Sequence, residues 1–211
     1  MNEHTQAARR LASEFEPLRK LRRSVGDPLL EPRAPSAFHA LSRAIVHQQL
    51  ASAAAGTIFR RLLLATGTPL NKHRVEACSD EQLRGAGLSA AKLLSLRDLA
   101  HQAPQLKLST LHHLSDAEIV ERLIQVRGIG RWTAEMFLIF QLRRLDVWPT
   151  SDLGVREGAR RMFGQVHRPT EKQLEEWGQR FVPYRSVAAW YMWRATEQPE
   201  EFFHGTVVLG C

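Results

Sequence analysis

The sequence predicts an all-α protein. Apolar residues recur at helical spacing in most segments, and Ser115 with Glu118 forms a capping box that is typical of a helix start. Stretches rich in glycine and proline separate these segments. A chain of 211 residues with 44% hydrophobic content can bury a core as one domain or as two small lobes.

The composition indicates a polyanionic partner and a reducing compartment. The formal net charge is +7 at pH 7, which suits binding to nucleic acid. The two cysteines, Cys78 and Cys211, lie far apart in the sequence, so a disulfide framework is not expected. No stretch approaches the length of a membrane span, and no spacing of His and Cys resembles a zinc site.

The N-terminal third is predicted to be helical with one linker. Residues 1–24 carry a single apolar stripe, which predicts an amphipathic helix. Three prolines between residues 27 and 35 mark a linker or loop. Ser36 is the expected cap of the next helix, and an alanine-rich helix follows as far as Leu63. The polar residues 47–49 between these two helices are interpreted as a turn.

The rest of the chain continues as helices with marked breaks. Ser89 is the expected cap of a helix that ends near Ala100, and residues 102–113 are expected to form a loop. Proline marks three later boundaries, namely the loop at Pro149, a helix start after Pro169, and a break at residues 183–186 before the last long helix.

A glycine hairpin near the centre of the chain is the first candidate for function. Gly128 and Gly130 stop one helix, allow positive φ, and let another backbone approach closely. A second helix begins at Arg131, and its free amides, together with the helix dipole, form an anion site suited to a phosphate. The phosphate-binding candidates are Gly128, Gly130, Arg131 and Thr133. An ordinary hairpin between two helices is the alternative.

Asp152 is the second candidate. It follows the Pro149 loop, at the point where helical periodicity resumes. A carboxylate at such a start is normally an N-cap, which is the structural alternative for Asp152. The order of a glycine hairpin, one buried helix, a proline loop and an aspartate favours a chemical role. Asp146 lies before the turn and ranks well behind Asp152.

These features together resemble a known family. The string V-R-G-I-G-R-W-T-A at residues 126–134, followed by the Pro149–Asp152 loop, is similar to the signature of the helix-hairpin-helix (HhH-GPD) DNA glycosylase superfamily. Residues 44–50, 87–92 and 183–186 add matching elements in the same order. The resemblance is to bacterial 3-methyladenine DNA glycosylases of the second (AlkA) type, and it covers most residues from about 38 to 196.

The resemblance implies a two-lobed, all-α HhH-GPD fold, with the active site in the cleft between the lobes. One unit of residues 1–211 is expected, with a central lobe of about residues 36–146 that includes the hairpin 124–133. The second lobe would comprise about residues 1–35 plus 147–211. The chain has no room or strand pattern for the β domain that precedes the helical part of full-length relatives, so we expect a reduced form.

The resemblance also assigns roles to single residues. Asp152 would be the catalytic residue, and the residues of the base pocket would be Trp132, Tyr184, Met136 and Gln48. Gln49 and Leu50 would form the wedge that enters the DNA when a nucleotide is extruded. A role in the core is the alternative for Trp132 and the favoured interpretation for Met136, and loop support is the alternative for Gln48. Backbone carbonyls of Ile124, Val126 and Ile129 would hold a monovalent cation, Na⁺ or K⁺.

The activity implied is monofunctional hydrolysis of the N-glycosidic bond of alkylated bases, of the 3-methyladenine and 7-methylguanine type, in base excision repair. Bifunctional members carry a lysine where this chain has Trp132, and no lysine lies between Lys107 and Lys172. We expect no AP-lyase activity, no required cofactor and no iron–sulfur cluster. The expected partner is double-stranded DNA with damaged bases, bound by a cytoplasmic, bacterial, monomeric protein that has no membrane contact.

Two other functions stay open at this point. One is a glycosylase for other damaged bases. The other is a non-catalytic helix-hairpin-helix DNA-binding protein, which accounts for the charge and the hairpin but gives no reason for the Asp152 loop or for the break at Tyr184.

Overall fold

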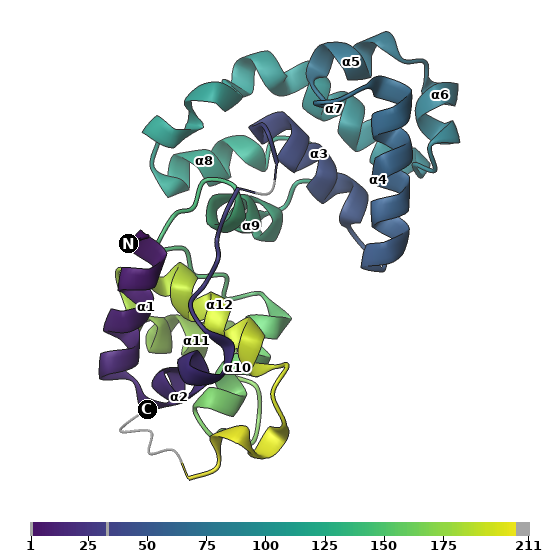
Figure 1. Ribbon diagram of the computed structural model, residues 1–211. Coiled ribbons are helices and arrows are strands. Elements are labelled where there is room, and N and C mark those ends of the chain that lie inside the picture. The colour runs from purple at the N-terminus through teal and green to yellow at the C-terminus, as the bar shows by residue number, and fades with distance from the viewer. Residues whose placement is uncertain (1, 33, 206–211) are drawn as a thin grey trace. The chain divides into compact units, whose positions relative to one another are not determined.

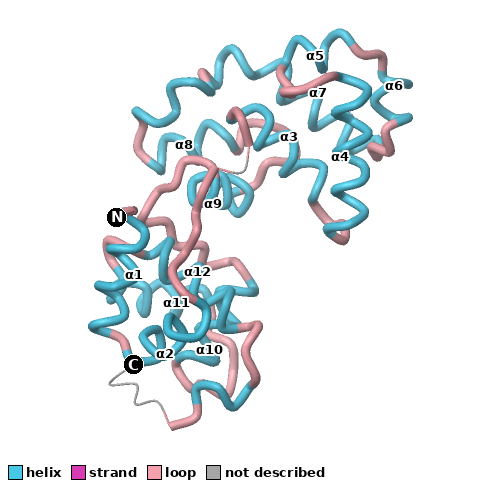
Figure 2. Tube along the Cα trace, in the orientation of Figure 1, coloured by secondary structure: helices cyan, strands magenta, loops and turns pink. Residues whose placement is uncertain are grey.

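The computed structural model describes residues 2–32 and 34–205, which contain helices and loops and no strand (Figure 2). The predicted all-α class is therefore confirmed for this part of the chain. The α-helices are α1 (Glu3–Glu14), α2 (Glu16–Val25), α3 (Ala37–His47), α4 (Ser52–Thr66), α5 (Lys72–Ala77), α6 (Asp80–Gly85), α7 (Ala90–Leu106), α8 (Asp116–Leu123), α9 (Arg131–Phe140), α10 (Leu153–Met162), α11 (Glu171–Gly178) and α12 (Arg185–Ala195). The 3-10 helices are η1 (Leu108–His113), η2 (Gln179–Phe181) and η3 (Glu200–Phe203).

The helices form two compact units. One comprises residues 1–31 and 143–211, and the other comprises residues 32–142. The sequence interpretation placed the corresponding boundaries near residues 36 and 147, and the arrangement of two lobes around a cleft stays a prediction. None of the helices in the described ranges has both the length and the apolar character that crossing a lipid bilayer requires.

The first unit is built from an N-terminal and a C-terminal segment of the chain. Helices α1 and α2 pack against α12, and α10 packs against α12 (Figure 1). The predicted single helix over residues 1–24 is wrong, because the chain is extended at Phe15 with φ −129° and ψ 107°. Pro17 then occupies the first turn of α2, where its missing N–H costs no helical hydrogen bond. Both helices still direct their apolar residues, including Leu18 and Leu21, into one core.

A glycine allows α10 and α12 to cross closely. A Cβ atom built at Gly158 would lie 1.9 Å from the carbonyl oxygen of Met192. Any larger residue would therefore force the two helices apart. The close crossing matters because α10 begins directly after Asp152 and α12 carries Trp193.

The second unit contains the predicted hairpin. Side chains of Ser36, Ser89 and Ser115 accept the expected backbone N–H groups at the starts of α3, α7 and α8, which confirms the three predicted caps. The loop predicted over residues 102–113 is wrong in part. Helix α7 continues to Leu106, with a proline in its last turn, and η1 follows.

An ion-pair cluster fastens the end of α10. Glu157 accepts hydrogen bonds from Arg160 at 2.9 Å, from Arg161 at 3.0 Å and from Arg168 at 3.0 Å. Glu200, the first residue of η3, forms an ion pair with Arg160. The guanidinium of Arg160 and, after it, those of Arg161 and Arg168 lower the pKa of Glu157 to about 2.

We predict that this cluster makes stability fall at acidic pH. The pKa of Glu157 is lowered on folding, so its contribution is complete above the ordinary value of 4.5 and is lost as the pH falls towards about 2. Glu157→Gln should lower the free energy of unfolding by roughly 1–2 kcal/mol at pH 7, after allowance for solvent screening. Denaturant unfolding between pH 2 and pH 7 measures both effects.

The matched control is Glu14→Gln, which removes an exposed ion pair with Arg10. That variant should change the free energy of unfolding by about 0.5 kcal/mol or less. An acid limb that is equally steep in Glu157→Gln and in the wild type would show that other carboxylates cause it.

Candidate active site

Asp152 stands at the N-terminus of α10, in the first unit. Its Oδ1 atom accepts the backbone N–H of Val155 at 2.8 Å and the indole N–H of Trp193 at 2.9 Å. The first bond is an N-cap, the structural role that was the alternative for Asp152. The second bond comes from α12, so two elements fix the orientation of one carboxylate. Asp152 retains 9% exposure, and the residue is therefore not completely sealed from solvent.

The loop that delivers Asp152 is bonded to the start of α12. Arg185 donates from Nε to Oδ1 of Asp146 and from its Nη2 to Oδ2, each at 2.8 Å. The buried hydroxyl of Ser186 accepts the N–H of Val147 at 2.9 Å. The bidentate pair gives Asp146 a structural role, in agreement with its low rank as a catalytic candidate.

Tyr184 lies at the break that the sequence analysis singled out. It is the N-cap residue of α12, with φ −124° and ψ 30°. The side chain is half-buried and packs against the core of the first unit. Tyr184 directly precedes Arg185 and Ser186, which fasten the Asp152 loop.

The hairpin of the second unit rests on α7. Gly128 has φ +77°, and a Cβ atom there would lie 2.5 Å from Oγ of Ser95, so both its conformation and its packing require glycine. Oδ2 of Asp98 accepts the N–H of Arg127 at 2.6 Å. Gly130 differs from the expectation, because its φ is −91° and it serves as the N-cap residue of α9. A Cβ at Gly130 would meet no atom within 4 Å, so this side of the hairpin is open.

The first turn of α9 presents one exposed and one buried candidate. Trp132 is 45% exposed, whereas Thr133 is buried. Arg131 is also largely exposed and pairs with Glu135 at 2.9 Å. The side chain of Thr133 is therefore directed into the unit, and only its backbone amide suits the predicted phosphate site.

The turn between α3 and α4 lies against the hairpin. Nε2 of Gln48 donates to the carbonyl of Gly128 at 2.7 Å and to Oγ1 of Thr133 at 3.4 Å. This geometry favours loop support, one of the two roles considered for Gln48. Gln49 and Leu50 are exposed, and Gln49 has a φ of +55°.

A histidine ends α3, and a lysine of α7 supports the same turn. Burial, and then the positive charges of Arg43 and Lys92, lower the pKa of His47, so its imidazole is neutral at pH 7. The amino group of Lys92 donates to the carbonyls of Val46 at 2.6 Å and of Gln48 at 2.8 Å.

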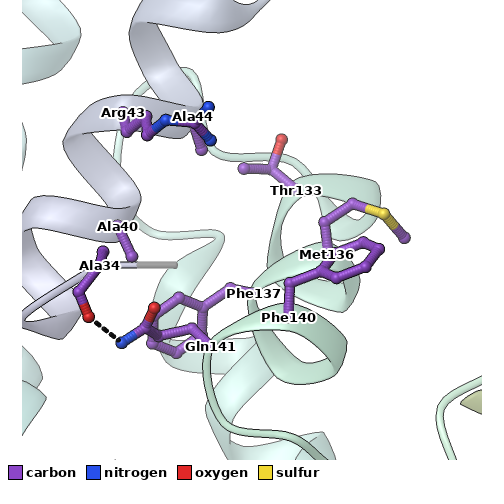
Figure 3. Close-up of a pocket in the computed structure, with 9 residues that line it drawn as sticks. All are labelled: Ala34, Ala40, Arg43, Ala44, Thr133, Met136, Phe137, Phe140 and Gln141. Atoms are coloured by element: carbon purple, nitrogen blue, oxygen red, sulfur yellow. Dashed lines mark hydrogen bonds between the residues drawn. The ribbon is translucent and has the colours of Figure 1, made fainter. Parts of the chain in front are cut away.

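An apolar pocket of about 130 Å³ opens between α3 and α9. Figure 3 shows Arg43 and Ala44 on one side and Met136, Phe137 and Phe140 on the other. Met136 is half-buried and lines this pocket, so the structure gives it a place on a pocket wall rather than within the core. Gln141 closes one end through a hydrogen bond from Nε2 to the carbonyl of Ala34, at 3.1 Å.

The candidates thus fall into two groups, each described within its own unit. Asp152 and Tyr184 belong to the first unit, and the hairpin, the turn and Met136 belong to the second. Among residues 2–32 and 34–205, no group of three or more His, Cys, Asp or Glu side chains could hold a metal ion. The predicted reduced state of Cys211 lies outside the described residues.

Three supporting residues were missed by the sequence analysis. Trp193 in the last long helix and Lys92 in the helix capped by Ser89 were not singled out. Asp98 carried no signal at all. Each of them acts on a residue that is at least 29 positions away in the sequence, and helical periodicity cannot reveal such a contact.

Comparison with known proteins adds independent findings. The family model described as "HhH-GPD superfamily base excision DNA repair protein" matches residues 42–183. The Schizosaccharomyces pombe protein named DNA-3-methyladenine glycosylase 1 is 36% identical over 173 residues, which is 80% of this chain and 75% of that protein.

Two solved structures are similar over nearly their whole length. The S. pombe 3-methyladenine DNA glycosylase, solved in complex with abasic DNA, has a TM-score of 0.81 and 32% identity, and the match covers 92% of this chain and 98% of that chain. A DNA-3-methyladenine glycosidase from Bacillus halodurans also has a TM-score of 0.81 and 32% identity, and the match covers 91% of each chain.

We predict that Trp193→Phe lowers the free energy of unfolding by about 1–2 kcal/mol, because a carboxylate loses one of its donors while most of the aromatic packing is kept. In a double-mutant cycle with Asp152→Ala, the coupling energy should reach about 1 kcal/mol. Urea unfolding of the four proteins measures it. Trp190→Phe, in the same helix, is the control and should show no coupling to Asp152.

Proposed function

This chain belongs to the HhH-GPD superfamily of base excision DNA repair proteins, and we propose that it is a monofunctional 3-methyladenine DNA glycosylase with Asp152 as its catalytic carboxylate. The observation that carries the proposal is the double support of Asp152 by Val155 and Trp193, downstream of a hairpin suited to DNA. Alkylated bases such as 3-methyladenine and 7-methylguanine are the proposed leaving groups. The protein would act as a cytoplasmic monomer on damaged duplex DNA.

The hairpin would bind the DNA backbone. Gly130 is open to an approaching phosphate, and the first amides of α9 carry the positive end of the helix dipole. Arg131 adds an exposed cation beside these amides. Because such contacts carry no sequence information, they suit an enzyme that meets its substrate in any sequence.

The hairpin carbonyls of Ile124, Val126 and Ile129 are the proposed ligands of a Na⁺ or K⁺ ion. The carbonyl of Val126 accepts the N–H of Ile129 at 3.0 Å, and a carbonyl oxygen has a second lone pair for a cation. When bound, the ion would add positive charge next to the phosphate.

Gln49 and Leu50 would enter the duplex. A base within a duplex is out of reach, so the nucleotide must rotate out, at a cost of a few kcal/mol. Both side chains are exposed on the turn that Gln48 ties to the hairpin, which supports a wedge at this position. A glutamine fills the space with poorer stacking than an apolar wedge.

Asp152 would stabilise the sugar during bond cleavage. As the C1′–N bond breaks, positive charge develops on the sugar, and a fixed carboxylate lowers the energy of that state. The same carboxylate can direct a water molecule onto C1′, so that water supplies the hydroxyl group and the base departs with the bonding electrons. A base alkylated on N3 or N7 is already cationic, so it leaves without a strong general acid.

Trp132, Tyr184 and Met136 are the proposed contacts of the extruded base. Trp132 is exposed and Tyr184 is half-buried, so each aromatic side chain can offer part of its ring to a ligand. An electron-poor, cationic base is attracted to such faces by cation–π interaction. Met136 adds an adaptable apolar contact at the pocket of Figure 3.

The strongest alternative is a protein that binds DNA without chemistry, and a glycosylase for other damaged bases is the second. The second donor, Trp193, fixes Asp152 beyond what an N-cap requires, and this favours catalysis over binding alone. Release of methylated bases from methylated genomic DNA identifies the proposed activity, and release of other bases from duplexes with other kinds of damage separates the two alternatives.

We predict that Asp152→Asn reduces the single-turnover rate of base release from methylated duplex DNA by about 10²- to 10³-fold, because the charge that stabilises the sugar cation is lost. Asparagine is also a good N-cap, so α10 and DNA affinity should be retained. The control Glu171→Gln removes another carboxylate of the first unit, at the start of α11, and should keep full activity. Full activity in Asp152→Asn would rule out its catalytic role.

We also predict that borohydride treatment during turnover traps no covalent protein–DNA adduct. A Schiff base needs an amine at the sugar, and Trp132 occupies the position of the family's lysine. Denaturing gel electrophoresis with end-labelled DNA measures trapping and strand cleavage together. A shifted protein–DNA band would contradict the monofunctional assignment.

A further inference from the structure

One face of α7 supports both loops that are proposed to contact DNA. Lys92, Ser95 and Asp98 are spaced three residues apart, so they lie along the same side of the helix. Ser95 lies against Gly128, and Asp98 holds the N–H of Arg127. Lys92 reaches instead to the turn at residues 47–50. A single rigid helix therefore sets the distance between the turn and the hairpin.

The amino group of Lys92 binds backbone carbonyls at the end of α3. Its Nζ lies 2.6 Å from the carbonyl of Val46 and 2.8 Å from that of Gln48. Both carbonyls belong to the C-terminal end of α3, where the helix dipole is negative and a cation is favourable. Lys92 is half-buried, and burial lowers the pKa of its ammonium group.

The turn needs such a clamp because its backbone is strained. Gln49 has φ +55°, a left-handed conformation that a residue with a Cβ adopts only at an energetic cost. The preceding residue is held twice, by Lys92 at its carbonyl and by the Gly128 carbonyl at its side-chain amide. Gln49 itself is exposed. The bonds to Gln48 therefore stabilise the strained backbone and leave the side chain of Gln49 accessible.

We propose that Lys92 is a positioning residue that holds the turn 47–50 in the conformation needed for Gln49 and Leu50 to enter the duplex and extrude the damaged nucleotide. The inference rests on the proposed glycosylase function and adds a role for a residue that touches neither DNA nor the reacting atoms. Loss of Lys92 should therefore impair extrusion and leave backbone binding unchanged.

The test compares the wild type, Lys92→Met and the control Lys72→Met. Lys72 pairs with Glu76 on the same unit, so its replacement removes an equal charge without touching the turn. The substrate is an oligonucleotide duplex with one 7-methylguanine, opposite either cytosine or an abasic site. We expect Lys92→Met to lower the single-turnover rate at least 10-fold opposite cytosine, and by about 2-fold or less opposite the abasic site, where extrusion is easier.

Two further measurements separate positioning from phosphate binding and from misfolding. The fluorescence of 2-aminopurine beside the lesion should rise on binding of the wild type and of Lys72→Met, and should rise at least 5-fold less with Lys92→Met. Affinity for undamaged duplex should be equal in all three proteins between 50 and 200 mM salt. A phosphate contact would instead weaken this affinity and reduce the salt slope by about one in Lys92→Met, which would overturn the proposal.

The milder variant Lys92→Arg keeps a cationic donor for the two carbonyls and should recover most of the rate, which covers the case that Lys92→Met folds poorly. Equal rates for the wild type and both Lys92 variants on the cytosine duplex would refute the proposed role of Lys92. That outcome would leave the proposed glycosylase function unaffected. Absence of base release by the wild type would refute the proposed function itself.

Discussion

The proposed chemistry of this protein depends on one carboxylate oxygen. Oδ1 of Asp152 accepts a backbone amide of its own helix and an indole N–H from α12. An N-cap alone would fix the helix start and leave the side chain free to follow local motion, whereas a second donor from a different helix fixes its orientation. The carboxylate is thus held in one orientation by the protein itself, which is the condition that the proposed electrostatic stabilisation requires.

In each unit, one helix holds the loops that carry the candidate residues. In the first unit, the start of α12 fastens the loop before Asp152 through Arg185 and Ser186. In the second unit, α7 supports the hairpin and the turn at residues 47–50. A loop that is bonded to a rigid helix has a well-defined position, and its exposed residues remain accessible to a ligand. Neither set of supports includes a residue that the proposed mechanism places in contact with the base.

The local features of the fold were predictable, and the tertiary contacts were not. The caps at Ser36 and Ser115 could be predicted because each depends on neighbouring residues. The helix starts after Gly130 and at Asp152 could be predicted for the same reason. Trp193 and Lys92 look like an ordinary core residue and an ordinary surface residue in the sequence, because their partners come from distant segments. The break at Phe15 was missed because the apolar stripe continues across it.

The packing of α1 and α2 against α12 has a consequence for biosynthesis. The unit of residues 32–142 is contiguous in sequence. It can therefore fold as soon as it has emerged from the ribosome. Leu18 and Leu21 share their core with Phe181 and Tyr191, so the first helices must wait, with apolar faces uncovered, until the last ones have been translated. The nascent chain would therefore complete the unit with the hairpin before the unit with Asp152.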